Sequence, residues 1–221
     1  MKHARTCGSH LLTIALLSCL WMLPGCKTRE IAASKDGGAK TLVFSDDFER
    51  AELGDAWRRG EGEGGSGRWE IKEGWLHASD IKNDPLWWIG QLPDDARVEF
   101  DAQSLSDAGD LKVEIFGDRK KHESGYILIF GGWRNALDVI ARLDEHGKDR
   151  KAQRSRKVTP NKTHHFVIER RGTTITWWVD DEELMSFEDS APLRGQGHRG
   201  FAFNDWTAPV KFDNLAVYRL D

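Results

Sequence analysis

Cysteine is scarce in this sequence of 221 residues. Its three cysteines are Cys7, Cys19 and Cys26, and all of them stand near the N-terminus. If an export signal ends before Cys26, only one cysteine remains in the exported chain and no intramolecular disulfide can form. The core of that chain must then hold together without a covalent cross-link.

Helical and nucleic-acid-binding patterns are lacking as well. No stretch repeats its apolar residues at helical spacing over three turns. The 36 acidic residues outnumber the 32 basic ones, which argues against nucleic acid as a partner. The one strongly basic stretch, residues 148–157, is expected to be a solvated loop rather than a site for an anionic ligand.

Two further patterns that would indicate a catalytic or metal site are absent. The sequence has no Gly-x-Ser-x-Gly motif, so it offers no nucleophile elbow. His164 and His165 are adjacent, so on a strand they point to opposite faces and cannot bind one metal ion together. A zinc site is therefore not expected, and no cofactor is expected apart from a structural calcium ion, which is considered below.

Residues 1–25 have the pattern of an export signal. Lys2 and Arg5 give this segment a positive start, and residues 11–23 form its apolar core. That core has about the length of a secretion signal and is too short for a comfortable membrane span.

The end of the signal, Leu23-Pro24-Gly25-Cys26, resembles the lipobox of bacterial lipoproteins. The resemblance implies cleavage before Cys26 and lipidation of that cysteine, with the lipid anchor as the only contact with the membrane. Lys27 follows where inner-membrane lipoproteins of some bacteria carry Asp, so the resemblance favours the outer membrane of the cell envelope. Residues 26–40 are expected to form a flexible tether, and residues 41–221 are expected to form one domain.

Alternation with period two is clearest in the last quarter of the chain. Turn residues at Arg171-Gly172 and Asp180-Asp181 separate short runs whose apolar residues share one face. These apolar residues are Phe166, Ile168, Ile175, Trp177, Val179, Phe201 and Phe203. The pattern predicts an antiparallel β-sheet.

The closing strand carries an irregularity. Phe212 and Leu215 differ in parity, so a regular strand would turn one of them away from the core. A β-bulge at Asp213-Asn214 would let both face the core, and we predict one there.

Upstream segments add strands of two kinds. Residues 97–103 and 111–115 alternate cleanly, so each is expected to have one buried face and one face in water. Residues 125–130 are apolar on both faces, which predicts a central strand that is covered on both sides or borders a ligand. The glycine-rich residues 49–67 are expected to form a loop.

The order of these elements resembles the concanavalin A-like lectin/glucanase superfamily, of the laminin-G or 3-keto-glycoside hydrolase type. The resemblance covers about residues 42–219, and its best marks are the Arg-Arg-Gly hairpin at 170–172 and the closing Phe-Asp-Asn-Leu strand at 212–215. It implies an all-β jelly-roll sandwich of two antiparallel sheets, with the first and last strands adjacent. It also implies ligands, often carbohydrates, at the concave sheet or its rim.

Glucanase catalysis has weak support in the residues. Glu99 and Asp101 resemble the paired acids of laminarinase-type glucanases, but Gln103 stands near the place of the third acid. Residues i and i+2 of a strand lie roughly 6.5–7 Å apart at the backbone, which does not by itself give the carboxyl separation of about 5 Å that retaining glycosidases use. We favour the alternative, a polar sheet face with Lys112 and Arg97 as charge partners.

The 3-keto-glycoside hydrolase type is a broader enzymatic alternative. It would need a positioned acid and a bound metal ion. Asp110, Glu114, Asp138 and Asp205 are candidate acids, and nothing in the sequence selects among them.

Calcium fits the sequence better than zinc because calcium takes oxygen ligands from carboxylates and carbonyls. Relatives of the resembled fold often join their first and last strands with such an ion, and Asp47 and Asp213 could meet in that way. In the simpler alternative, Asp213 and Asn214 hydrogen-bond the backbone of the bulge, and we favour that alternative.

Three stretches near expected strand ends mix aromatic rings with amides and carboxylates, which is the mixture that sugar binding needs. The candidate ligand-binding residues are Trp88, Trp133, Asn135, Asn204, Asp205 and Trp206. Core packing is the alternative for each aromatic residue, because large rings dominate sandwich cores. The hypothesis depends most on Trp133 and Trp206, which lie outside the expected strands beside Asn and Asp.

The sequence therefore predicts an exported bacterial lipoprotein whose single domain binds a glycan or related polar ligand without catalysis. A glycoside hydrolase of the 3-keto-glycoside type is the alternative from another class. A structural or adhesive envelope protein that binds a protein partner is the third.

Overall fold

The computed structural model describes Met1 and residues 38–61 and 66–221. The expected export signal, Cys26 and most of the expected tether lie outside the described residues, so these expectations stay predictions. Gly38–Asp221 forms one compact unit. Within the described ranges, no helix is both long enough and apolar enough to cross a membrane.

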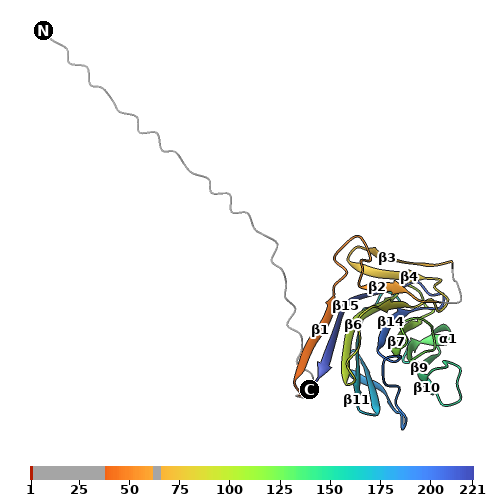
Figure 1. Cartoon of the computed structure of the whole chain (residues 1–221). Coiled ribbons are helices and arrows are strands. Elements are labelled where there is room, and N and C mark those ends of the chain that lie inside the picture. Colours follow the sequence, from red (N-terminus) through yellow and green to blue (C-terminus); the bar gives the residue numbers. More distant parts are fainter. Residues whose placement is uncertain (2–37, 62–65) are drawn as a thin grey trace. The chain divides into compact units, whose positions relative to one another are not determined.

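Sheet A runs in the order β13-β12-β11-β6-β15-β4-β3, and β1 also pairs with β15 (Figure 1). Its strands are β1 (Lys40–Asp46), β3 (Arg68–Lys72), β4 (Trp75–Ser79), β6 (Ala96–Ser104), β11 (His164–Arg171), β12 (Thr174–Val179), β13 (Glu182–Glu188) and β15 (Val210–Leu220). Adjacent strands are antiparallel throughout. The first and last strands pair, as the resemblance implied.

Sheet B runs in the order β10-β9-β8-β7-β14-β5-β2, again with antiparallel neighbours. Its strands are β2 (Trp57–Arg59), β5 (Leu86–Trp88), β7 (Leu111–Gly117), β8 (Tyr126–Gly131), β9 (Leu137–Arg142), β10 (Lys151–Arg154) and β14 (Gly200–Asn204). A single helical turn, α1 (Gly132–Asn135), joins β8 to β9, and its Trp133 and Arg134 have left-handed backbone conformations.

The inner faces of the two sheets meet in a core rich in aromatic rings. Phe100 of β6 stacks on Phe166 of β11 with ring centroids 4.8 Å apart, and Phe203 of β14 stacks on Phe212 of β15 at 4.4 Å. Phe100 and Phe203 meet edge to face at 5.4 Å, a contact that joins sheet A to sheet B. The prediction of an all-β sandwich of two antiparallel sheets is confirmed.

The closing strand contains the predicted bulge. Asp213 pairs with Asp101 and Ala216 pairs with Glu99, so the register shifts between these two pairs. Asn214 has a left-handed φ of 53° at this point. As a result, Phe212 and Leu215 are both buried in the core despite their different parity.

The side chain of Asp46 holds the loop that follows β1 through hydrogen bonds and an ion pair. Its carboxylate accepts hydrogen bonds from the Trp57 indole at 2.7 Å and from the Phe48 N–H at 3.0 Å, and it forms an ion pair with Arg50. Burial opposes ionisation of Asp46, but these contacts prevail and lower its pKa. Trp57 stacks on Phe203 at 5.6 Å, and so residues 57–59 form a strand of sheet B where the glycine pattern predicted only a loop.

The basic stretch also contains a strand that the sequence analysis expected to be a loop. β10 pairs with β9 at the edge of sheet B. Lys151 Nζ donates to the Ser186 carbonyl oxygen at 2.6 Å, and Arg156 forms an ion pair with Glu182 at 2.7 Å. Charged side chains suit an edge strand because they discourage pairing with another chain, and they also hide the apolar alternation that marks a strand.

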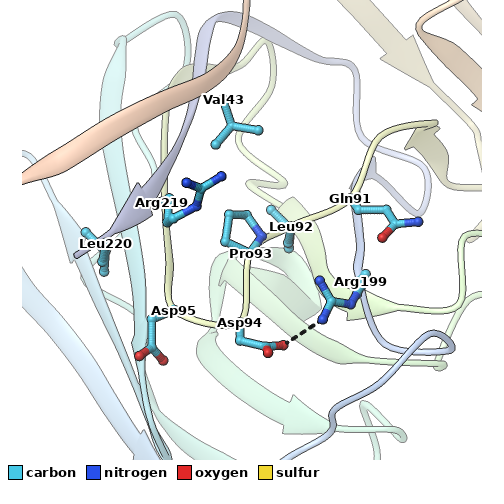
Figure 2. A pocket seen from close by; sticks show the side chains of 9 residues that line it. All are labelled: Val43, Gln91, Leu92, Pro93, Asp94, Asp95, Arg199, Arg219 and Leu220. Atoms are coloured by element: carbon cyan, nitrogen blue, oxygen red, sulfur yellow. Dashed lines mark hydrogen bonds and ion pairs between the residues drawn. The ribbon is translucent and has the colours of Figure 1, made fainter.

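A hollow of about 410 Å³ opens on the surface of this unit, and Figure 2 shows the side chains that line it. They come from β1, from the segment 91–95 that leads into β6, from Arg199 just before β14, and from the end of β15.

Candidate functional site

The outer face of sheet B, which points away from the sandwich core, carries charged residues that are almost completely buried. Lys112 and Glu114 of β7 are 2% and 0% exposed, and Asn204 of β14 is 0% exposed. Lys112 lies opposite Asn204 in the ladder, which places the two side chains on one face. The expectation that β7 has one face in water is therefore wrong, because loops cover that face.

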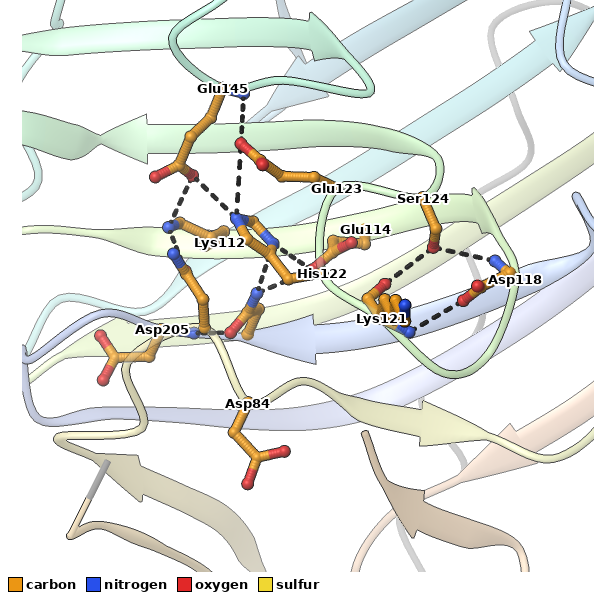
Figure 3. Close-up of polar contacts among 12 residues, drawn as sticks. Asp84, Lys112, Glu114, Asp118, Lys121, His122, Glu123, Ser124, Glu145 and Asp205 are labelled. Atoms are coloured by element: carbon orange, nitrogen blue, oxygen red, sulfur yellow. Dashed lines mark hydrogen bonds and ion pairs between the residues drawn. The ribbon is translucent and has the colours of Figure 1, made fainter. Parts of the chain in front are cut away.

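A polar cluster occupies this face; we use that name for Asn83, Lys112, Glu114, His122, Glu145, Asn204 and Asp205 (Figure 3). Glu114 Oε1 accepts a hydrogen bond from Asn204 Nδ2 at 2.7 Å and lies 2.8 Å from His122 Nδ1. The other ring nitrogen of His122 lies 3.6 Å from Glu145 Oε2. The imidazole therefore lies between two carboxylates from different segments and contacts Glu114 at hydrogen-bond distance.

Lys112 forms the second half of the polar cluster. Its Nζ lies 2.8 Å from Glu145 Oε2 and donates to Asn83 Oδ1 at 2.8 Å. Burial disfavours the Lys112 cation, but Asp110 and Glu145 outweigh burial and raise the pKa of Lys112. Burial likewise disfavours the Glu145 carboxylate, and Lys112 lowers the pKa of Glu145 below its ordinary value. Both groups are therefore charged at neutral pH.

The loop that carries His122 is held by its own short turn. Asp118 Oδ1 accepts the N–H of Lys121 at 2.9 Å, and Ser124 Oγ donates to the Lys121 carbonyl oxygen at 2.7 Å (Figure 3). Glu123 Oε1 accepts the N–H of Glu145 at 3.0 Å, which links this loop to the one after β9. The two loops thus place His122 and Glu145 over the sheet in a fixed arrangement.

Asp205 is the most perturbed acid of the polar cluster. Burial and the charge of Asp110 raise the pKa of Asp205 to about 8, and Lys112 opposes this rise only in part. The backbone N–H groups of Ile81 and Trp206 approach the carboxyl group and also oppose the rise. The Trp206 N–H, however, is directed at Asp110 Oδ2, 2.9 Å away, and neither oxygen of Asp205 has a well-formed hydrogen bond. Burial thus favours the protonated form of Asp205.

Several buried polar atoms of this region lack a hydrogen-bond partner among the described residues. They are Asp84 Oδ1, Glu114 Oε2, His122 Nε2 and both carboxyl oxygens of Asp205. Buried polar groups in folded proteins are nearly always satisfied by protein, ordered water or a ligand. Because these atoms are enclosed by the protein, ordered water inside the cluster is the partner that can reach them.

Apolar side chains border the polar cluster on the same outer face. Ile127, Ile129, Val139 and Ala141 of β8 and β9 form a second buried apolar group, separate from the main core. This confirms the expectation that the strand at 125–130 is covered on both sides. On the other flank, Trp87 of β5 is fully buried. A mixture of apolar and polar groups is typical of ligand sites.

Two exposed tryptophans stand near one end of this face. Trp133 is 36% exposed and Trp206 is 42% exposed. Asp110 lies between their segments, because it donates its N–H to the Gly131 carbonyl oxygen and accepts the Trp206 N–H. We call Trp133 and Trp206 the tryptophan rim.

Trp133 is held by contacts with the loop after β9. Its ring meets His146 edge to face at 5.6 Å, and the Arg150 guanidinium lies 4.9 Å from its ring centroid. His146 follows Glu145 of the polar cluster directly in the chain. The same loop therefore supports both the rim and the cluster.

The predicted ligand residues divide into two groups. Asn204 and Asp205 belong to the polar cluster, and Trp133 and Trp206 form the rim beside it. Trp88 corrects the prediction, because its side chain points into the sandwich core, where it is 5% exposed and stacks on Phe44 at 4.8 Å. Both faces of this strand carry apolar residues, so alternation in the sequence could not show whether Trp87 or Trp88 faces the core.

Asn135 also differs from the prediction. Its Oδ1 accepts the N–H of Val158 at 2.8 Å, and its Nδ2 donates to the Val158 carbonyl oxygen at 2.7 Å. Both ends of the amide are therefore used to fasten the 155–158 segment to α1, and the residue is 8% exposed. Asn135 supports the turn that presents Trp133 and is not available to a ligand.

The acids singled out for glucanase chemistry lie on the other sheet. Glu99 and Asp101 belong to β6 of sheet A. Glu99 pairs with Arg97 and with Lys40, and Arg97 also pairs with Glu169 at 2.7 Å. Arg97 is thus a charge partner, as predicted, whereas the prediction for Lys112 is wrong because Lys112 lies on sheet B.

The structure brings several acids near the bulge. Burial raises the pKa of Asp213 to about 6, and the charges of Asp101, Glu49 and Asp47 add to the rise. Asn214 donates its N–H to Asp213 Oδ1 at 2.7 Å, which is the bulge contact that the simpler alternative expected. Among residues 38–61 and 66–221, no three His, Cys, Asp or Glu side chains are grouped so as to hold a metal ion.

Sequence analysis missed Lys112, His122 and Glu145 as candidates for the site, and it named Glu114 only as one of four candidate acids. Period two alone places Lys112 and Glu114 together on the outer face, so a signal for those two was present. His122 and Glu145 stand in loops without periodicity, and only the three-dimensional arrangement brings them to the cluster.

Comparison with known proteins was informative at the level of structure. No protein-family model matches the chain, and no curated protein matches it either. Among solved structures, a CBM66 carbohydrate-binding module from Bacillus subtilis superposes with a TM-score of 0.58 at 15% identity, covering 74% of this chain and 96% of that chain. A Bacillus licheniformis β-glucanase has a TM-score of 0.55 at 13% identity, covering 79% and 96%.

A laminarinase from Flavobacterium sp. UMI-01 is similar to the same degree. Its TM-score is 0.56 at 14% identity, and the match covers 81% of this chain and 100% of that chain. Identities this low report the fold and leave function open. The two antiparallel sheets and these structural neighbours together show that residues 38–221 have the concanavalin A-like jelly-roll fold.

Proposed function

We propose that the domain binds a carbohydrate without cleaving it, at the polar cluster and the tryptophan rim of sheet B. The observation that carries the proposal is the pair of exposed indoles, Trp133 and Trp206, whose segments both hydrogen-bond to Asp110 beside the polar cluster. Flat indole rings suit the C–H faces of a pyranose, while carboxylate, amide and imidazole groups suit its hydroxyls.

The fold adds support of a general kind. Structural neighbours include a carbohydrate-binding module and enzymes described as a glucanase and a laminarinase. These proteins present glycan-directed functions on the same architecture, but a fold hosts many functions. The residues of the site therefore carry the argument, and the neighbours only make a glycan the first ligand class to test.

A glycan array with the purified full chain tests the proposal. We expect selective binding, and we expect Trp133→Ala to weaken it at least tenfold, about 1.4 kcal/mol. Trp75→Ala is the matched control, because Trp75 lies on sheet A with Lys211 Nζ 4.2 Å from its ring centroid, a contact like that of Trp133 with Arg150. If no glycan binds, the protein-partner alternative gains support.

Hydrolysis is the second candidate, and Asp205 is the observation that favours it. A carboxyl group with a pKa of about 8 can donate a proton at neutral pH, and Glu114 and Glu145 supply carboxylates in the same cluster. A release assay for reducing or keto sugars on the glycans that bind separates the two functions. Turnover that is lost in Asp205→Asn with binding retained would establish catalysis.

The location of the protein is part of the proposal. A lipid anchor on Cys26 would hold the glycan-binding domain at the surface of the bacterial outer membrane. Mass spectrometry of the protein from its native membrane should show an acylated N-terminal peptide that begins at Cys26. Cleavage at another position, with Cys26 unmodified, would refute the anchor.

A further inference from the structure

The hollow of about 410 Å³ is a second place where another molecule can bind (Figure 2). Its size is within the range of small-molecule sites, which begins near 300 Å³. Apolar groups of Val43, Leu92 and Pro93 line it together with polar side chains. It involves none of the residues of the polar cluster or the tryptophan rim.

Two arginines with unused donors line this hollow. Arg219 makes no hydrogen bond or ion pair through its side chain within the described part of the chain, and it is exposed. Arg199 Nε is buried and has no hydrogen-bond partner there. Figure 2 shows the two side chains on either side of Leu92 and Pro93. The exposed Arg219 guanidinium can therefore donate hydrogen bonds to an acceptor on another molecule.

The acids at the hollow are already engaged. Asp94 Oδ1 lies 3.3 Å from Arg199 Nη2 and 3.8 Å from Arg170 Nη2. Asp95 Oδ1 accepts the N–H of Gly172 at 2.8 Å. Asp94 is thus paired with two arginines, whereas Arg219 has no ion pair in the described part of the chain.

Backbone contacts hold the wall of the hollow in place. Arg170 Nε donates to the Asp94 carbonyl oxygen at 2.7 Å, and the Leu92 N–H donates to the Arg199 carbonyl oxygen at 2.8 Å. The Leu220 N–H donates to the Asp95 carbonyl oxygen at 3.1 Å. The segment that forms the wall is therefore fastened at both ends to neighbouring strands, which favours a preformed site.

We propose that this hollow binds an anionic sugar, one whose ring carries a carboxylate. The carboxylate would accept hydrogen bonds from Arg219, since a planar guanidinium group matches a carboxylate in charge and shape. Gln91 and Asp94 stand at the same hollow to contact ring hydroxyls, and Val43 and Pro93 offer an apolar surface to the ring. The proposal does not rest on glycan binding at sheet B.

Calorimetric titration of the full chain with D-glucuronate, D-glucose and acetate tests the proposal. We expect glucuronate to bind at least tenfold more tightly than either of the other two, because only glucuronate has both the carboxylate and the ring. If glucose bound as tightly as glucuronate, the carboxylate and the arginine would not contribute to binding. If acetate bound as tightly as glucuronate, the sugar ring would not contribute. If no binding is detected at about 10 mM glucuronate, the affinity is weaker than millimolar, and the proposal is overturned.

Variants locate the binding. Arg219→Gln should weaken glucuronate binding at least tenfold, and because Arg219 is exposed and unpaired the variant should fold normally. Arg68→Gln is the matched control, since Arg68 is an exposed arginine on β3 without a side-chain contact in the described residues, and it should leave binding unchanged. Trp133→Ala should also leave it unchanged. If Trp133→Ala abolished glucuronate binding and Arg219→Gln did not, the anionic sugar would bind at sheet B, and this site would be refuted.

Discussion

Lys112 and Glu145 form an ion pair of 2.8 Å whose side chains are only 2% and 10% exposed. Lys112 stands near the start of β7, and Glu145 stands in the loop after β9. A buried pair of this kind gains little over an apolar pair, but removal of one member leaves an uncompensated charge. This relationship makes the energetics of the polar cluster testable without knowledge of its ligand.

Lys112→Met should lower the free energy of unfolding by about 3–5 kcal/mol, because Glu145 would stay buried without its cation. The double variant Lys112→Met/Glu145→Leu should recover a large part of this loss. Urea unfolding measures both. The exposed pair Arg156–Glu182 is the control, and Arg156→Met should change stability by at most about 1 kcal/mol. A Lys112 variant as stable as the wild type would show that Glu145 is solvated or protonated.

Asp205 should make stability fall as pH rises. Its pKa is about 8 in the folded protein and about 3.9 in an unfolded chain, so the folded state holds the proton more tightly between these values. The stabilisation is complete below pH 4, is lost as pH rises through 8, and changes by at most about 1.4 kcal/mol per pH unit. Asp205→Asn has no carboxyl group to titrate, so it should not lose stability in this way. The wild type should lose stability between pH 5 and pH 8, and the stability of the variant relative to the wild type should therefore rise over that range.

Urea midpoints of the wild type and Asp205→Asn across that range provide the measurement. Other acids shift in the opposite direction, such as Asp46, whose pKa is lowered, so only the difference between the two proteins isolates Asp205. Glu188→Gln, an exposed change at the end of β13, controls for a general effect of charge. Parallel pH curves for the wild type and Asp205→Asn would mean that Asp205 is ionised in the folded protein.

Period two in the strands predicted the antiparallel sheets, and the resemblance to the concanavalin A-like superfamily implied their arrangement as a sandwich. The parity switch between Phe212 and Leu215 located the bulge to the residue, since only a bulge lets both face the core. Trp133 and Trp206 were selected because they fall outside the alternating runs. The same rule failed at Trp87 and Trp88, where both neighbours are large and apolar and both faces of the strand are buried.

The polar cluster was harder to predict. A charged residue on an alternating strand ordinarily faces water, so Lys112 and Glu114 were assigned to a solvated face. Their burial depends on loops that bring His122 and Glu145 over the sheet, and loop conformation has no periodic signal in sequence. Tertiary structure determines which groups contact a buried charge. The presence of a lysine at position 112 does not predict those groups.

Asp46→Ala should lower the free energy of unfolding by about 2–4 kcal/mol. The substitution removes the acceptor for the Trp57 indole and the Phe48 N–H, and it breaks the ion pair with Arg50; buried donors without acceptors are costly. Asp47→Ala is the control, because Asp47 is exposed and, among the described residues, its side chain accepts only the N–H of Glu49, at 3.2 Å. Equal effects of the two substitutions in urea unfolding would contradict the role assigned to Asp46.

Asn214 should tolerate glycine better than alanine. Its φ of 53° lies in the left-handed region, which costs a residue with a Cβ about 1 kcal/mol relative to glycine. Both substitutions remove the hydrogen bond of 2.9 Å from Asn214 Nδ2 to Asp101 Oδ2, so the difference between them isolates the backbone. Thermal and urea unfolding should rank the wild type first, Asn214→Gly second and Asn214→Ala last. If Asn214→Ala were at least as stable as Asn214→Gly, the backbone of the bulge would have left the left-handed conformation in the alanine variant.

Calcium binding at Asp47 and Asp213 remains a prediction, and the structure suggests how to test it. Negative charges of Asp47, Glu49 and Asp101 act on Asp213, so a divalent cation would relieve their repulsion. Millimolar calcium should then raise the melting temperature of the wild type, and a chelator should reverse the rise. Asp213→Asn should abolish the calcium effect, whereas Asp118→Asn, in the loop of sheet B, should retain it. A wild-type melting temperature that does not respond to calcium would favour the alternative in which Asp213 only hydrogen-bonds the bulge.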